Sequence, residues 1–131
     1  MAADFTVIIA VRQHFGNRAG SRPGAFVGNE KRYAFDCPNV DPDTWAVLMF
    51  ETLDVDHELN AFEVNGHAIA GGIPKSPSRN AWNGNVVLIN PNWLKEHGNE
   101  LYIGSLNSEG TLSRDIDDFV MDNVVVLYKT K

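Results

Sequence analysis

The dipeptide Asn65-Gly66 constrains the fold more than any other feature of the chain. Short runs in which apolar and polar residues alternate flank it on both sides, and Asn-Gly is the preferred sequence of a two-residue hairpin turn. Such a turn pairs Val64 with His67 and Phe62 with Ile69. Phe62, Val64 and Ile69 then share one face, which we expect to point into the core, with His67 partly exposed at the mouth of the turn.

Other segments have the composition of strands, because they are rich in β-branched and aromatic residues and are separated by clusters of Gly, Pro, Asn and Asp. The expected strands cover residues 5–11, 32–37, 44–55, 85–89, 99–106 and 118–129, the last with a bend or bulge near Asp122–Asn123. So many strands with almost no helix predict an all-β, two-sheet sandwich of the jelly-roll type.

One short segment, NPNWLKEHG over residues 90–98, predicts one or two turns of helix. Asn90 suits the N-cap, Pro91 the first helical position and Gly98 the end. Of the three tryptophans, Trp45 lies in an expected strand and Trp93 in this expected helix, so both are expected in the core.

The chain has 131 residues, 44% of them hydrophobic and 21% charged, which is typical of one globular domain over residues 1–131. Residues 12–32 stand apart as a Gly/Arg-rich loop or arm without sustained periodicity. Two phenylalanines and several basic residues in it are candidates for a protein contact: Phe15, Arg18, Arg22 and Phe26. We expect this arm to be ordered mainly by a neighbouring subunit, as in a homo-oligomer or lattice. Solvated loop arginines are the simpler alternative.

Charge and cysteine content limit the setting. The net charge is −6, with a balance of +3 over residues 1–32 and −11 over residues 33–128, so the acidic body argues against a nucleic-acid groove. The only cysteine, Cys37, cannot form an internal disulfide. The N-terminus lacks a positively charged region before its apolar run, so we expect cytoplasmic synthesis without a signal peptide, with later release as part of a particle left open. No apolar run is long enough to span a membrane.

Three motifs follow one another along the chain, and their order is typical of one fold family: Val64-Asn65-Gly66, then Gly71-Gly72, then Leu94-Lys95-Glu96-His97-Gly98-Asn99-Glu100-Leu101. Residues 45–128 resemble the galactose-binding-domain-like jelly roll. They are similar to the sugar-binding domain of family 2 glycoside hydrolases, such as β-galactosidases and β-glucuronidases. Those domains have a segment Leu-Lys-x-Gly-x-Asn-x-Leu, whereas here one extra residue separates Lys95 from Gly98 and Asn99 follows the glycine directly. The resemblance implies a fold that admits ligand binding, often as a scaffold for a separate catalytic barrel.

No motif of an activated nucleophile, a zinc site or a phosphate-binding loop appears, so we expect a non-enzymatic protein without a cofactor. Two acidic clusters offer oxygen ligands of the type that Ca²⁺ prefers. Related jelly-roll modules often hold a structural calcium, and the candidate ligands here are Asp54, Asp56, Asp117 and Asp118. Solvated loop acids explain the same clusters.

A carbohydrate site needs an aromatic platform surrounded by polar side chains. Trp82 in an expected loop is the best platform, with Arg79, Asn80 and Asn83 beside it. A tryptophan that closes the end of the sandwich is the competing interpretation.

Two functions follow as hypotheses. The first is a non-catalytic, lectin-like carbohydrate-binding module. The second is a structural or interaction protein of a phage-like particle or another assembly, as a decoration or tail-associated component with a protein partner.

Overall fold

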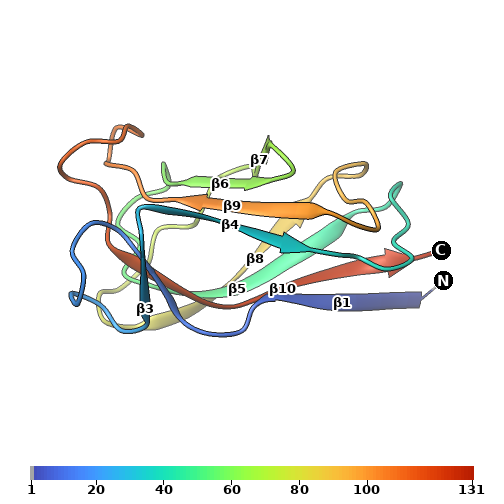
Figure 1. Ribbon diagram of the computed structural model, residues 1–131, viewed down its shortest axis with the longest axis horizontal. Helices are drawn as coiled ribbons and strands as arrows, with labels where there is room; N and C mark the ends of the chain where they lie inside the picture. Colours follow the sequence, from blue (N-terminus) through green and yellow to red (C-terminus); the bar gives the residue numbers. More distant parts are fainter. Residues whose placement is uncertain (1) are drawn as a thin grey trace.

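Two sheets pack face to face in the computed structural model, which describes residues 2–131 (Figure 1). The first sheet contains β1 (Ala2–Ile9), β2 (Gln13–Phe15), β3 (Ala25–Gly28), β5 (Ala46–Leu53), β8 (Trp82–Ile89) and β10 (Phe119–Thr130). The second sheet contains β4 (Glu30–Phe35), β6 (Ala61–Val64), β7 (His67–Ala68) and β9 (Asn99–Gly104). Residues 2–131 form strands, turns and loops but no helix. The expected all-β, two-sheet sandwich is therefore confirmed.

The long strand β10 organises the first sheet, in which the order is β3-β2-β10-β5-β8. β1 pairs antiparallel with the C-terminal part of β10, and β2 pairs with its N-terminal part. The pairing of β10 with β5 shifts register between Asp122 and Val125, and Asn123 there has a φ of 48°. This irregularity confirms the predicted bulge. In the second sheet the order is β4-β9-β6-β7.

The hairpin at Asn65-Gly66 forms as predicted. Both turn residues have positive φ, 51° and 80°, as a type I′ turn requires. Val64 pairs with His67, and the Ile69 N–H donates to the Phe62 carbonyl at 2.9 Å. Phe62, Val64 and Ile69 are buried, so the predicted core face is confirmed.

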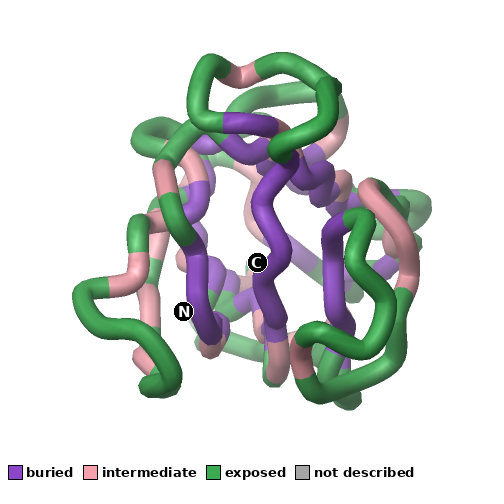
Figure 2. The backbone as a smooth tube through the Cα atoms, turned by 90° about the vertical axis from the view of Figure 1, so that its left-hand side faces the viewer, coloured by how far each residue is buried: buried purple, intermediate pink, exposed green. Residues whose placement is uncertain are grey.

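The core lies between the inner faces of the two sheets, and Figure 2 shows buried segments in the interior with exposed loops around them. Phe50 of the first sheet packs edge to face against Phe62 of the second, with ring centroids 5.2 Å apart. Phe15 stacks on Phe119 at 5.3 Å. Because aromatic pairs contribute beyond their buried area, these contacts help to join the layers and the arm to one core. Within residues 2–131 no helix is long and apolar enough to span a membrane.

The expected helix over residues 90–98 is wrong. Asn92 has a φ of 70°, which is left-handed and interrupts a helix. The side chain of Asn99 accepts from the Lys95 N–H at 3.0 Å and donates to the Lys95 carbonyl at 2.7 Å. A side chain therefore satisfies the backbone groups that a helix would have paired, and the segment remains a series of turns.

Two expectations for tryptophans also need correction. Trp45 immediately precedes β5 and is 52% exposed, so it is not a core residue. Trp82 is the first residue of β8 and pairs with Leu53, so it lies in a strand and not in a loop. Trp93 is half-buried against the core and stacks on His67, with ring centroids 4.9 Å apart.

The arm over residues 12–32 contains β2, β3 and the start of β4, so it is more regular than a loop. Phe15 is fully buried in the core of the same chain, whereas Phe26 is 43% exposed and touches His14 edge to face. Arg18 and Arg22 form ion pairs with carboxylates of the same chain. These contacts replace the expectation that a neighbouring subunit is the main source of order in the arm.

Candidate functional site

Loops from distant parts of the chain meet at one end of the sandwich, on the left of Figure 1. They are residues 16–24 after β2, 54–60 after β5, 69–81 before β8 and 105–118 between β9 and β10. Ion pairs between charged side chains join these loops, and so do hydrogen bonds from backbone N–H groups to carboxylates. This end collects most of the candidate residues and is the candidate functional site.

A buried histidine–aspartate pair anchors the arm. Nε2 of His14 lies 2.8 Å from Oδ1 of Asp118, and both side chains are fully buried. Asp118 also accepts from the Arg18 backbone N–H at 3.1 Å and from Arg18 Nε at 3.0 Å. Gly16 makes room for this carboxylate, because a Cβ there would lie 2.0 Å from Asp118 Oδ1. Burial alone would raise the pKa of Asp118, but the bonds from Arg18 and His14 hold that pKa below its ordinary value.

A second buried carboxylate, Asp54, ties the arm to the end of β5. Its Oδ2 lies 3.2 Å from Arg22 Nε, and its Oδ1 accepts from the Asn80 backbone N–H at 2.7 Å. Asp54 has a φ of 58°, a conformation that Asp tolerates better than most residues. Because Arg22 also donates to the Asp118 carbonyl at 3.3 Å, one guanidinium joins both buried acids of the network.

Asp117 is buried without a cationic partner. Its Oδ2 accepts from the Asp56 backbone N–H and from Asn60 Nδ2, each at 2.9 Å. Its Oδ1 is buried and has no hydrogen-bond partner among residues 2–131. Burial raises the pKa of Asp117 above its ordinary value, although the two hydrogen bonds act in the opposite direction. Adjacent aspartates in one loop therefore have pKa values shifted in opposite directions.

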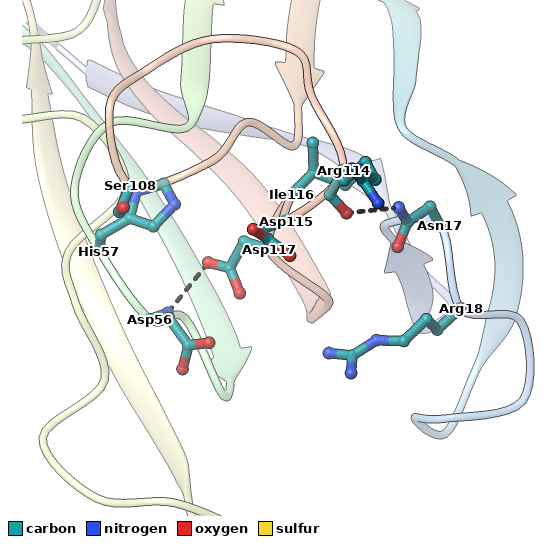
Figure 3. Close-up of a pocket in the computed structure, with 9 residues that line it drawn as sticks. All are labelled: Asn17, Arg18, Asp56, His57, Ser108, Arg114, Asp115, Ile116 and Asp117. Atoms are coloured by element: carbon teal, nitrogen blue, oxygen red, sulfur yellow. Dashed lines mark hydrogen bonds between the residues drawn. The ribbon is translucent and has the colours of Figure 1, made fainter.

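An open cavity of about 330 Å³ lies beside Asp117 (Figure 3). Both signs of charge line it, and Figure 3 shows Asp56 and Arg18 on opposite sides of the opening. His57 in the wall accepts from the Leu59 N–H at Nδ1, and its Nε2 lies 3.0 Å from the Leu106 carbonyl oxygen. The lining residues are Asn17, Arg18, Asp56, His57, Ser108, Arg114, Asp115, Ile116 and Asp117.

A second cavity of about 400 Å³ shares Asp56 with the first. It lies between the residues that follow β5 and the loop before β8, and Lys75 and Arg79 are among its lining residues. Arg79 Nη2 lies 3.3 Å from Asp56 Oδ1, and both side chains are substantially exposed. Asp56 therefore stands between two polar cavities and is open to solvent in both.

The four aspartates expected to hold calcium do come to this end, but they do not fit a common cation. Asp54 and Asp118 are already paired with arginines, and Asp117 and Asp56 meet through a backbone N–H. Among residues 2–131 no group of three or more His, Cys, Asp or Glu side chains is arranged around a metal position. Calcium binding stays a prediction that these contacts do not favour.

The residues expected to hold carbohydrate do not share one cavity. Arg79 lines the second cavity, whereas Asn80 contributes its backbone N–H to Asp54. Asn83 donates to the side chain of Asn85 within β8, at 3.2 Å. Trp82 lines neither cavity, and the Arg12 guanidinium lies over its ring, 5.0 Å from the centroid. One face of the expected aromatic platform is therefore already occupied by a cation–π contact.

Sequence reasoning missed the residues that line the first cavity opposite Asp56, including Arg18, Arg114 and Asp115 as a group. Arg18 and Arg114 lie far apart in the chain, and no local pattern links them. The one available signal is the acidic run that includes Asp117, which the sequence predicts as a source of calcium ligands.

No model of a known protein family matches the chain, and comparisons with curated proteins and with solved structures also give no match. The expected likeness to the galactose-binding-domain-like fold therefore stays a prediction. Function has to be inferred from the geometry.

Proposed function

We propose that the protein is a non-catalytic carbohydrate-binding module that holds its ligand at the loop end of the sandwich. One observation supports this: a cavity in which exposed carboxylates and exposed guanidinium groups surround the same opening. Asp56 and Asp115 can accept hydrogen bonds from sugar hydroxyls, and Arg18 and Arg114 can donate to them. Its volume of about 330 Å³ lies at the lower end of the range for small-ligand pockets, which suits a short glycan.

The ligand contact is centred on Asp56, because this side chain lines both cavities. Its exposed carboxylate is paired with Arg79 across the second cavity, so a sugar in either cavity can reach one of the two groups. In this proposal Trp82, the first residue of β8, does not contact the sugar, because it lines neither cavity and Arg12 lies over its ring.

A glycan array followed by calorimetric titration of any bound glycan tests this proposal. Asp56→Asn keeps the shape and the backbone N–H that holds Asp117, and it should weaken binding by about tenfold or more, because a hydrogen bond to a charged group is lost. Glu109→Gln is the matched control, since Glu109 is exposed in the same loop region but does not line the cavity.

Three results would contradict the proposal. One is an array without a bound glycan. Another is equal loss of binding in Glu109→Gln and Asp56→Asn. The third is loss of binding in Trp82→Ala while Asp56→Asn binds normally, which would return the contact to Trp82.

A second candidate function, a structural or interaction role in an assembly, is favoured by a different observation. The outer face of the first sheet exposes apolar side chains on four adjacent strands. Apolar patches of this kind on soluble domains are typical of contact surfaces. A module that binds glycans and also associates would gain avidity from several linked sites.

A further inference from the structure

Eight apolar side chains form two unbroken rows across β1, β10, β5 and β8. Strand register aligns the members of each row from strand to strand. One row contains Phe5, Leu127, Val47 and Leu88, and the next contains Val7, Val125, Met49 and Val86. We call these eight residues the open rows.

The open rows point away from the core. Phe5, Val86 and Leu88 are 60%, 64% and 56% exposed. Between the row members on β5 and β10 lie Leu48 and Val126, which are completely buried, and between those on β8 lies Val87, which is partly buried against the core. Since side chains alternate between the two faces of a strand, the first sheet is apolar on both faces. An apolar outer face contributes nothing to the core of a single copy.

The chain covers the other end of this outer face itself. His14, Leu53 and Val120 also point outward by strand register, yet each is less than 9% exposed. The segment after β2 is attached there by Arg18 and Arg22, which pair with Asp118 and Asp54. This cover ends before the open rows.

We propose that a second copy of this chain covers the open rows, so that two first sheets pack face to face about a two-fold axis. The proposal goes beyond carbohydrate binding and does not depend on it. The open rows and the two flanking rows that carry Lys129 and Glu51 span four strands about 4.8 Å apart and about eight residues of about 3.4 Å along each strand, which gives a contact of about 500 Å² per copy. About 1,000 Å² in total lies at the lower limit of a specific interface, where association is weak and transient.

Charges beside the open rows select the orientation of the axis. Glu51 and Asp122 flank the row of Val125, and Lys129 flanks the row of Leu127 on the opposite side. Arg12 lies 3.5 Å from Asp122, which leaves a net negative charge on that side. A two-fold axis that lies between the two sheets and runs across the strands brings the acidic side of each copy to Lys129 of the other. An axis along the strands would instead place like charges together.

An apolar hollow of about 170 Å³ lies next to this contact. Trp45, Val47 and Leu127 are among its lining residues. With the axis across the strands, Met49 of one copy faces Val47 of the other, at the edge of the hollow. A flexible methionine side chain fills irregular apolar spaces well. The same geometry explains why Trp45 lies outside the core, because it borders the proposed interface.

Sedimentation equilibrium from about 1 µM to about 1 mM tests the proposal. The native protein should rise from 14.5 kDa toward twice that mass. Phe5→Lys and Val86→Lys, at opposite edges of the open rows, should each remain at 14.5 kDa with an unchanged circular dichroism spectrum. Ala34→Lys is the matched control, because Ala34 is exposed on β4 of the second sheet, and it should associate like the native protein.

Three results would overturn the proposal. A native protein that stays at 14.5 kDa throughout excludes the dimer. Association that Val86→Lys abolishes and Phe5→Lys does not would indicate pairing through the free edge of β8 instead. Equal loss in Ala34→Lys would show that added charge alone prevents association.

The orientation has its own test. Glu51→Lys and Lys129→Glu should each weaken the dimer several-fold, and the double variant should recover most of the native dissociation constant, because the opposite charges meet again. Double reversal without any recovery would contradict the axis across the strands.

Discussion

The outer faces of the two sheets differ although their inner faces follow the same apolar pattern. On the second sheet, Arg32 pairs with Glu100 at 2.7 Å and lies over the ring of Tyr102, whose hydroxyl donates to Glu30. On the first sheet, the corresponding positions carry the open rows. Folding of one copy requires only the inner faces to be apolar. The polar outer face of the second sheet suits solvent, whereas the apolar outer face of the first sheet suits the contact with a second copy that we propose.

The first sheet repeats this contrast within one face. At one end the arm covers outward residues and binds through buried acids, and at the other end the open rows remain uncovered. We expect substitutions at the covered end to change the free energy of unfolding. Substitutions in the open rows should change association instead.

The largest expected effect is at the covered end. Asp118→Ala leaves His14 and the backbone of Arg18 without their acceptor, and breaking a buried charged network costs about 3–5 kcal/mol. Urea unfolding should show this loss in the free energy of unfolding. Asp115→Asn, an exposed acid in the same loop, should change it by less than about 0.5 kcal/mol. A loss below about 1 kcal/mol in Asp118→Ala would mean that the arm is not held by this network.

Two leucines on the outer face of the first sheet compare its ends directly. Leu53 is 7% exposed beneath the covered end, and Leu88 is 56% exposed in the open rows. Leu53→Ala should cost about 2–4 kcal/mol, since it creates a cavity, whereas Leu88→Ala should cost less than about 1 kcal/mol in dilute protein. Equal costs in urea unfolding would show that the two ends do not differ in cover.

The opposite pKa shifts of neighbouring aspartates predict opposite pH trends. The lowered pKa of Asp118 means that its stabilisation is present above the ordinary value near 3.8 and is lost as pH falls through the folded pKa. The raised pKa of Asp117 means that its ionised form destabilises the fold, so this cost appears as pH rises through its folded pKa.

Urea unfolding of matched variants between about pH 3 and about pH 7 measures both trends. The destabilisation caused by Asp118→Asn should shrink toward the acid end. The free energy of unfolding of Asp117→Asn, relative to that of the native protein, should be highest near neutral pH. Parallel trends in the two variants would contradict the assignment of opposite shifts.

The smallest expected effect concerns the turn of the second sheet. Gly66 has a φ of 80° with open space around it, so Gly66→Ala introduces backbone strain but no clash and should cost about 1 kcal/mol. Gly84 also has open space but lacks a positive φ, so Gly84→Ala should cost nothing measurable. Equal midpoints for the two variants in thermal unfolding would mean that the turn conformation does not limit stability.

Local patterns predicted the parts of the fold that local chemistry decides. Asn65-Gly66 indicates the turn because both residues accept positive φ, and the near-continuous apolar run over residues 44–55 indicates a strand. That run also indicates an apolar outer face, since apolar and polar residues would alternate in a strand with one face in solvent.

The candidate site was less predictable because its contacts are distant in the chain. His14 and Asp118 are 104 positions apart, and no spacing rule links them. The helix prediction failed for a related reason, since the side chain of Asn99 and the left-handed Asn92 depend on the completed sheet. Trp82 was placed in a loop because Asn and Gly surround it, yet pairing with β5 overrides that preference.

If a second copy covers the open rows, dilution of the native protein changes the amide chemical shifts of the strands that carry these rows. From about 1 mM to about 10 µM, the amides of β1, β5, β8 and the C-terminal half of β10 should move together along one binding curve. The amides of β4 and β9, on the polar face, should remain in place. Shifts confined to β4 and β9, or no shifts at all over this range, would mean that no second copy covers the open rows.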